Sequence, residues 1–288
     1  MTVGGIEFAK GHGTENDFVL LPDPHGKLVL SVARVAALCD RRSGLGADGV
    51  LRVVRWEAFG GAPEPGVEWF MDYRNSDGSA AEMCGNGVRV FARYLARLGW
   101  LPGGPDAELR IGTRAGVRGV RFADGDGERG EVSVDMGPAR VGGPSTATVG
   151  GQAFDGIAVD VGNPHLACVT TAPIEALDLS VPPGHDPALF PHGVNVEFVS
   201  PPAPELDTEV AMRVHERGVG ETRACGTGTV AAVVAVLRVA GRDTGTVAVR
   251  SPGGLLRVTV TLDTTVLHGP AVLVAHGELD RSWWDTVG

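Results

Sequence analysis

Two helical segments stand out in the pattern of apolar positions, at residues 88–98 and 229–240. The second is apolar almost all round, which is typical of a helix enclosed by protein. It is well short of the ~20 residues that a helix needs to cross a bilayer. Gly99 and Gly241 follow the two segments, and a glycine in the left-handed conformation commonly ends a helix. The pattern therefore predicts a helix in each half of the chain, the second of them buried.

Short alternating or β-branched segments surround both helices and predict strands. In the first half they are residues 6–10, 17–21, 50–55, 68–73, 108–111, 117–122 and 132–136. In the second half they are residues 156–161, 165–170, 194–198, 247–250, 255–262 and 272–275. We expect further helices at 32–41, after an N-cap at Ser31, and at 173–179. Strands, a helix and strands, twice over, predict an α+β fold of two similar halves with the active cleft between them.

An acidic, glycine-rich stretch at 124–130 separates the two halves of the pattern. Such a stretch is typical of a solvated turn, so we place the domain boundary there. The prediction is an N-terminal domain over residues 1–129 and a C-terminal domain over residues 130–274. The tail, residues 275–288, is expected to return to the N-terminal domain.

A cysteine precedes each helix in a matching context, Cys84-Gly-Asn-Gly and Cys225-Gly-Thr-Gly. The start of a helix offers unpaired N–H groups and a partial positive charge, which favour a thiolate and a bound anion. A lone copy of this pattern is as readily a turn that holds a buried thiol. Two copies at matched positions favour one anion site with a thiol on either side, and there we expect the pKa of each cysteine to be lowered.

Composition and charge indicate which partners, cofactors and cellular location to expect. The net charge is −10 and the pI is about 5.3, which argues against nucleic acid or an anionic membrane surface as a partner. The chain begins with no charged-then-apolar leader, so we expect a cytoplasmic protein. The four cysteines lack C-x-x-C spacing, and we interpret Cys39 and Cys168 as core residues. The two lysines, Lys10 and Lys27, have no obvious setting for a pyridoxal-phosphate Schiff base, so we expect neither metal nor cofactor.

Six blocks in this order resemble the diaminopimelate epimerase family over nearly the whole chain. They lie at residues 12–18, 75–79, 84–89, 162–165, 194–195 and 216–226. The resemblance implies two pseudo-symmetric domains, each a curled, barrel-like mixed sheet around a central buried helix. It also implies conversion of LL- to meso-diaminopimelate without a cofactor, in the synthesis of lysine and peptidoglycan precursors, by a homodimer.

The resemblance also implies roles for individual residues. Cys84 and Cys225 would be the two acid/base catalysts. Backbone N–H groups of Gly85, Asn86, Gly226 and Thr227 would bind the reacting carboxylate. The far end of the substrate would be held by Asn16, Asn75, Asn163, Asn195, Glu216 and Arg217. For His165, ligand binding and core packing remain equally open.

The chain departs from the family's common pattern at three places. Thr14-Glu15 stands where Leu-Gly is commonest, and Thr227 replaces a frequent serine. Gly49 stands where many members carry a glutamine, which removes one potential contact to the substrate.

Three alternatives stay open at this stage. A proline or hydroxyproline racemase has a similar layout of two cysteines, but its cyclic substrate has no second amino-acid end to hold. The segment 226–231 matches the G-x-G-x-x-A pattern of nucleotide-binding proteins, although no apolar strand precedes it. Cys84 and Cys225 could also form the disulfide of a thiol redox protein.

Overall fold

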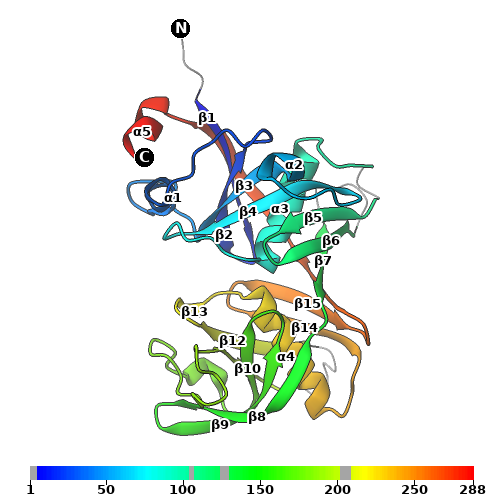
Figure 1. Cartoon of the computed structure of the whole chain (residues 1–288). Helices are drawn as coiled ribbons and strands as arrows, with labels where there is room; N and C mark the ends of the chain where they lie inside the picture. The colour runs from blue at the N-terminus through cyan, green and yellow to red at the C-terminus, as the bar shows by residue number, and fades with distance from the viewer. Residues whose placement is uncertain (1–4, 104–106, 124–129, 202–208) are drawn as a thin grey trace. The chain divides into compact units, whose positions relative to one another are not determined.

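The computed structural model describes residues 5–103, 107–123, 130–201 and 209–288 (Figure 1). The expected acidic turn and the predicted boundary at 129/130 fall on residues 124–129, which lie outside these ranges. The chain folds as two compact units. The first unit comprises Met1–Val134 with Pro270–Gly288, and the second comprises Asp135–Gly269.

In the first unit, eight described strands form one mixed sheet. In spatial order they are β17 (Val272–Leu279), β1 (Ile6–Gly13), β2 (Asn16–Pro22), β3 (Gly49–Arg55), β4 (Val67–Asn75), β5 (Leu109–Thr113), β6 (Gly116–Phe122) and β7 (Glu131–Gly137). The pairs β2–β3 and β4–β5 are parallel, and the other neighbours are antiparallel. The last strand of the chain therefore lies beside the first, as the dark blue and orange-red ribbons of Figure 1 show.

The second unit repeats this sheet. Its order is β8 (Arg140–Val149), β9 (Gln152–Asp160), β10 (Pro164–Val169), β11 (Asn195–Val199), β12 (Glu209–Glu216), β14 (Gly245–Ser251), β15 (Gly254–Val260) and β16 (Thr265–Pro270), with the short β13 (Gly220–Thr222) on β12. The pairs β10–β11 and β12–β14 are parallel, and the other neighbours in this order are antiparallel. Because the two sheets share the same succession of strand directions, the prediction of two similar α+β halves is confirmed.

Each sheet curls around one buried helix. Helix α3 (Gly85–Arg97) contacts β1, β2, β3, β4 and β17, and α4 (Gly226–Val239) contacts β9, β10, β11, β12, β14 and β15. Contacts to strands from across a sheet require the sheet to wrap around the helix. Both helices begin three residues earlier than predicted, because the cysteines themselves are the N-caps. Gly99 and Gly241 end them in the left-handed conformation, with φ of 67° and 68°, as predicted.

A smaller core lies under the remaining helices of the first unit. Helix α1 (Val32–Cys39) begins at Ser31, whose side chain accepts from the N–H of Arg34, so the predicted N-cap is confirmed. Its buried Val35 and Leu38 pack in one cluster with Trp284 of α5 (Arg281–Thr286). Helix α1 ends two residues earlier than expected. The helix expected at 173–179 is only the 3₁₀ turn η1 (Ile174–Ala176).

The sequence pattern missed several elements. They are α2 (Trp56–Phe59), α5, β8, β12, β13 and β16. Strand β8 contains Gly142-Gly143-Pro144, residues that punctuate strands. The structure accommodates them with an irregularity in its pairing to β9 between Val141 and Pro144.

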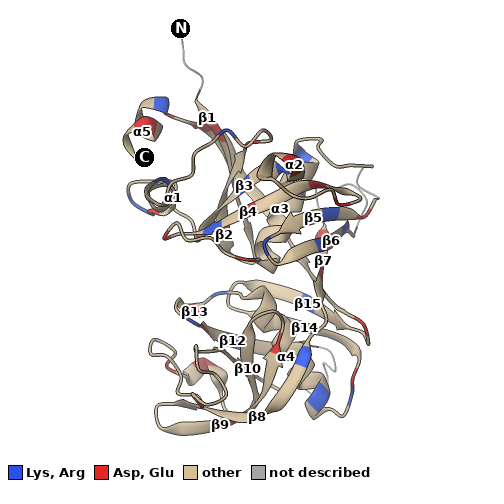
Figure 2. Cartoon of the chain, in the orientation of Figure 1, with Lys and Arg blue, Asp and Glu red and all other residues tan. Residues whose placement is uncertain are grey.

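Basic and acidic residues are interspersed along the strands and loops of both units (Figure 2). Among the described residues, no helix is both long and apolar enough to cross a membrane.

Candidate functional site

Cys84 is the N-cap of α3 and carries its thiol at the start of the helix. Its backbone is extended, with φ −144° and ψ 117°, and its Sγ accepts from the N–H of Gly87 at 3.4 Å. Gly85 and Asn86 are the first two helical residues, whose N–H groups have no intrahelical acceptor in helical geometry. This end of α3 therefore has the donors that a carboxylate or a thiolate requires.

Asn16 lies beside Cys84 with its side-chain orientation fixed. Its Oδ1 is 3.5 Å from the Cys84 Sγ, which donates to it, and 3.3 Å from the Nδ2 of Asn86. Its Nδ2 donates to the Oδ2 of Asp48 at 2.8 Å. Because a carboxylate only accepts, Asp48 dictates that the carbonyl end of Asn16 faces the thiol.

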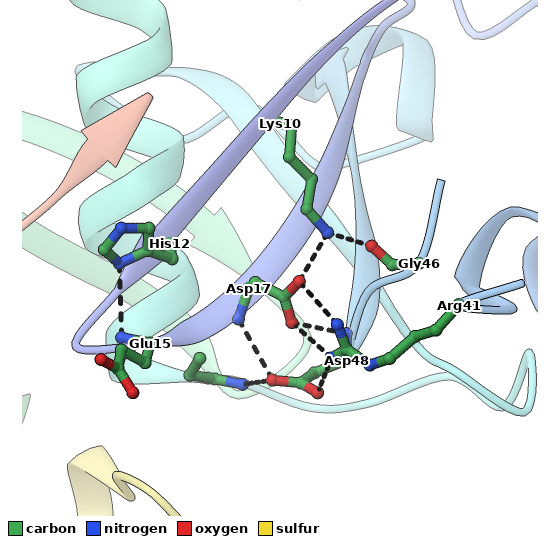
Figure 3. A network of polar contacts seen from close by, with 8 residues as sticks. Lys10, His12, Glu15, Asp17, Arg41, Gly46 and Asp48 are labelled. Atoms are coloured by element: carbon green, nitrogen blue, oxygen red, sulfur yellow. Dashed lines mark hydrogen bonds and ion pairs between the residues drawn. The ribbon is translucent and has the colours of Figure 1, made fainter. Parts of the chain in front are cut away.

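A network of charges holds Asp48 in turn (Figure 3). Arg41 donates through Nη2 to Asp48 and to Asp17, at 2.8 Å each. Lys10 donates to Asp17 at 2.6 Å and to the carbonyl of Gly46. Burial by itself would raise the pKa of Asp17, but the hydrogen bonds from Arg41 and Lys10 outweigh it and lower the pKa to about 2. Asp17 therefore stays ionised across the physiological range and anchors the network.

Asn75 is the last residue of β4 and lies in the same unit as Cys84. Its Nδ2 donates to the hydroxyl of Ser79 at 2.9 Å, and its backbone N–H donates to the carbonyl of Ser79. Asn75 therefore closes the turn at 75–79. Its side chain is half-buried, and binding a ligand requires it to share or release the Ser79 contact.

The structure shows the local setting of the two departures in the first unit. Thr14 and Glu15 are the two residues of the β1–β2 hairpin loop and have φ of 51° and 62°, the left-handed region that favours glycine. Gly49 pairs with Asn75 on β4, and an added Cβ would lie 2.5 Å from the carbonyl oxygen of Arg74 and 2.7 Å from Cε2 of Tyr73. A glutamine at this position would therefore require the backbone to shift.

We expect Gly49→Ala to lower the free energy of unfolding by about 1–3 kcal/mol, because the added methyl overpacks against backbone. Chemical denaturation measures the change. Gly143→Ala is the matched control, because an added Cβ there meets no atom within 4 Å. If Gly49→Ala leaves the midpoint of the denaturation curve unchanged, the added methyl does not clash with the backbone as proposed.

Cys225 repeats the arrangement at the start of α4. It is the N-cap, its Sγ accepts from the N–H of Gly228 at 3.4 Å, and the hydroxyl of Thr227 lies 3.5 Å from the sulfur. The expected lowering of its pKa is wrong. Burial first, and then the carboxylates of Glu216 and Glu197, raise the pKa of the Cys225 thiol well above its ordinary value.

A chain of polar contacts runs from the half-buried Thr227 to two buried side chains of the second unit. The Nδ2 of Asn163 donates to the Thr227 hydroxyl at 3.5 Å, and its Oδ1 is 3.0 Å from the Nε2 of His165. The Nδ1 of His165 is 2.7 Å from Oε1 of Glu197, and both side chains are fully buried. Because Asn163 Oδ1 only accepts, Nε2 of His165 carries a proton and directs the amide of Asn163 toward Thr227. Burial raises the pKa of Glu197.

The remaining predicted residues lie around β11 and the end of β12. Asn195 accepts from the backbone N–H of Arg217 at 2.9 Å and donates to the carbonyl of Pro164 at 3.0 Å. Glu216 accepts from the hydroxyl of Thr222. Arg217 is exposed, and its side chain donates only to the carbonyl of His192, at 3.4 Å, among the described contacts. Its guanidinium is therefore largely available to a ligand.

The structure thus brings the predicted residues together as two half-sites, each described within its own unit. Asn16 and Asn86 contact each other beside Cys84, whereas Asn163 and Thr227 form a chain to Cys225. The sequence analysis missed three charged residues that support these groups, Asp48, Arg89 and Glu197. Glu197 alternates with apolar residues in a strand, so its burial had no signal in the pattern.

A family model described as Diaminopimelate epimerase matches residues 8–142 and 157–274. Curated proteins named diaminopimelate epimerase are similar over almost their full length. Those of Rhodococcus opacus and Mycolicibacterium smegmatis are each 56% identical over 97% of this chain and 99% of the relative. That of Mycobacterium tuberculosis is 55% identical over 98% of this chain and 99% of the relative.

Solved structures of lower identity share the fold. A Bacillus anthracis phenazine biosynthesis protein of the PhzF family has a TM-score of 0.73 at 14% identity, covering 96% of this chain and 99% of its own. A hydroxyproline epimerase from Agrobacterium vitis has a TM-score of 0.69 at 15% identity, and the match covers 98% of this chain and 95% of the epimerase. At these identities the likeness concerns the fold alone.

Proposed function

We infer that this chain, which belongs to the diaminopimelate epimerase family, interconverts LL- and meso-2,6-diaminopimelate on the route to lysine. The observation that carries the proposal is the pair of thiols, each the N-cap of a buried helix. The family match includes both cysteine blocks. We propose that the meso-diaminopimelate it forms also serves as a peptidoglycan precursor.

Inversion at the α-carbon needs a base on one face and an acid on the other. We propose that one cysteine, as a thiolate, takes the α-proton onto its sulfur, while the other thiol gives its proton to the opposite face of the carbon. Each turnover therefore exchanges the protonation states of Cys84 and Cys225, and the reverse reaction restores them. The proton inventory balances with these two side chains alone, and the apparent pKa values belong to the pair.

The carbanion formed beside the carboxylate is the costly intermediate. The proposal assigns its stabilisation to N–H donors at the two helix starts, from Gly85, Asn86, Gly226 and Thr227. Oriented donors of this kind act where negative charge develops, and losing one costs about 2.7–4 kcal/mol.

Recognition of the far end of the substrate is assigned to Asn16, Asn75, Asn163, Asn195, Glu216 and Arg217. Arg217 can bind a carboxylate through two N–H groups, and Glu216 can accept from an ammonium. A proline or hydroxyproline substrate lacks that far end. The relatives at 54–56% identity carry the diaminopimelate name, whereas the hydroxyproline epimerase is 15% identical, which favours diaminopimelate.

Proton exchange tests this function. Reduced protein, with no cofactor added, is incubated in D2O with LL-diaminopimelate, and a parallel sample receives L-proline. NMR is expected to show deuterium at the α-carbon of diaminopimelate together with the meso isomer, and no exchange in proline. Exchange in proline alone would support the racemase alternative, and exchange in neither would reopen the redox and nucleotide-binding alternatives. Homodimerisation stays a prediction from the resemblance, and a cytoplasmic location stays a prediction from the sequence.

A further inference from the structure

Arg89 is a buried cation with no assigned role. It lies in the second turn of α3, after Cys84, and its side chain is fully buried. Within the described part of the chain its hydrogen-bond partners are all uncharged. They are the carbonyl of Pro270 at 3.3 Å, the carbonyl of Gly85 at 3.4 Å, Oδ1 of Asn86 at 2.9 Å and the hydroxyl of Thr14 at 3.5 Å.

Burying an arginine without a carboxylate in contact is costly, so its charge calls for an explanation. Burial lowers the pKa of Arg89 to about 10, which still leaves it a cation near neutral pH. The ionisable groups that act on it electrostatically are Cys84 first and Glu131 second. Its guanidinium also touches Gly85 and Asn86, the residues directly after Cys84. The charge is therefore placed beneath the helix start that carries the thiol.

The second half-site has the opposite electrostatics. The position five residues after Cys225 is Val230, which carries no charge. Glu197 lies close under this helix start, since a Cβ added to Gly228 would be 2.7 Å from its Oε1. Glu197 and Glu216 both oppose ionisation of Cys225. One thiol thus has a buried cation nearby, and the other has two carboxyl groups.

We propose that Arg89 is a positioning residue whose buried charge stabilises the thiolate of Cys84 and makes it the more readily ionised of the two thiols. The N–H of Gly87 acts in the same direction, and Oδ1 of Asn16 acts against it by accepting from the protonated thiol. A full charge outweighs one long hydrogen bond to sulfur in a buried setting. The consequence for catalysis rests on the proposed function, whereas the ionisation itself does not.

Several other charged groups on the elements packed against α3 are paired with one another. Asp72 of β4 pairs with Arg74, and Asp17 of β2 pairs with Lys10 of β1 and with Arg41. Arg52 of β3 pairs with Asp23 at 2.7 Å, and Arg55 of β3 pairs with Glu68 of β4 at 3.7 Å. The strands also carry Glu7 and His12 on β1, Glu131 on β7, and His276 and Glu278 on β17. Among the hydrogen bonds of the described residues, Arg89 is the cation whose side chain contacts the first turn of α3.

Alkylation of Cys84 in the absence of substrate tests the proposal. The rate of reaction with iodoacetamide is followed from pH 5 to pH 9 in Cys225→Ser protein, and peptide mass mapping identifies the modified residue. Cys39 and Cys168 should not compete, because burial raises their pKa to about 11 and about 12.

Arg89→Gln and Arg89→Met remove the charge, and Arg89→Lys keeps it. Arg93→Met is the matched control, because Arg93 is a buried arginine one turn further along α3.

We expect the neutral variants to react roughly tenfold more slowly at pH 7, with the same rate at the high-pH plateau. Arg89→Lys is expected to restore the rate to within about threefold, and Arg93→Met to leave the profile unchanged. A folded Arg89→Gln protein, checked by circular dichroism, whose profile superimposes on that of its parent would overturn the proposal. So would an equal shift in Arg93→Met.

A second measurement keeps Arg89 intact and so does not depend on how its variants fold. Cys84 in Cys225→Ser protein is expected to react with a midpoint at lower pH than Cys225 in Cys84→Ser protein. The reverse order would contradict the proposal. Because neither experiment uses diaminopimelate, either can fail while the proposed function stands, and the D2O experiment can fail while the ionisation stands.

Discussion

Replacing either Cys84 or Cys225 by alanine is expected to lower kcat for epimerisation by about 10²–10⁴-fold, the usual contribution of a positioned acid or base. The two losses should not add, because inversion requires both groups in one step, and the double variant should be little worse than either single variant. Steady-state conversion of LL-diaminopimelate to the meso isomer measures the effect. A single variant that retains a tenth of the activity would exclude that cysteine as an acid/base group.

Cys39→Ala and Cys168→Ala provide the matched controls for these variants. Both thiols are buried, and burial raises their pKa values to about 11 and about 12, so neither can serve as a base near neutral pH. Cys168 is fully buried among apolar side chains of the second unit, so its replacement should cost stability. Neither control should change kcat by more than about threefold in folded protein. A large loss in either folded control would mean that removing a thiol lowers kcat by a route other than loss of an acid/base group.

Arg217→Leu is expected to lower kcat/KM for LL-diaminopimelate by about 10–100-fold, because a charge-assisted hydrogen bond to the far carboxylate would be lost. The effect should appear mainly in KM, since this end of the substrate does not react. Oδ1 of Asn195 accepts from the backbone N–H of Arg217 at 2.9 Å and so holds the backbone at this position. The guanidinium can therefore move only as far as the Arg217 side chain allows. Arg217→Lys should recover only part of the loss, because lysine cannot bind a carboxylate through a planar pair of donors.

Arg250→Ala is the control for loss of an exposed arginine in the same unit. Arg250 pairs with Glu209 at 2.7 Å at the surface, a type of contact worth about 0–1 kcal/mol. Its kcat/KM should stay within about twofold of the parent. If Arg217→Leu behaves in the same way as this control, then Arg217 does not bind the substrate.

Much of the fold could be read from local pattern. The cap at Ser31, the position of each thiol at the start of a helix, and the glycine ends at Gly99 and Gly241 depend on the backbone within about one turn of each residue. Strand β8 could not be predicted in this way, because its Gly-Gly-Pro run contradicts strand propensity and it is its pairing with β9 that aligns this strand.

Some functional residues could likewise be predicted from the local sequence, and others depend on distant parts of the chain. The two thiols were visible because each stands in a repeated motif at the start of an apolar helix. The orientation of Asn16 was not visible, since it depends on Asp48, which lies 32 positions away in the chain. The direction of the Cys225 pKa was not visible either, because local reasoning includes the helix dipole but omits burial and the carboxyl groups that strands β11 and β12 bring close.

The sequence by itself therefore determined the fold class, the two buried helices with a thiol ahead of each, and the family, since these follow from short-range backbone preferences and recognisable motifs. Only the tertiary structure decided which charges lie beside each thiol. Arg89 and Glu197 are ordinary charged residues in the sequence, and folding turns them into buried groups beside Cys84 and Cys225. Electrostatic effects act through space and strengthen as water is excluded, so they cannot be read before the distant strands are in place.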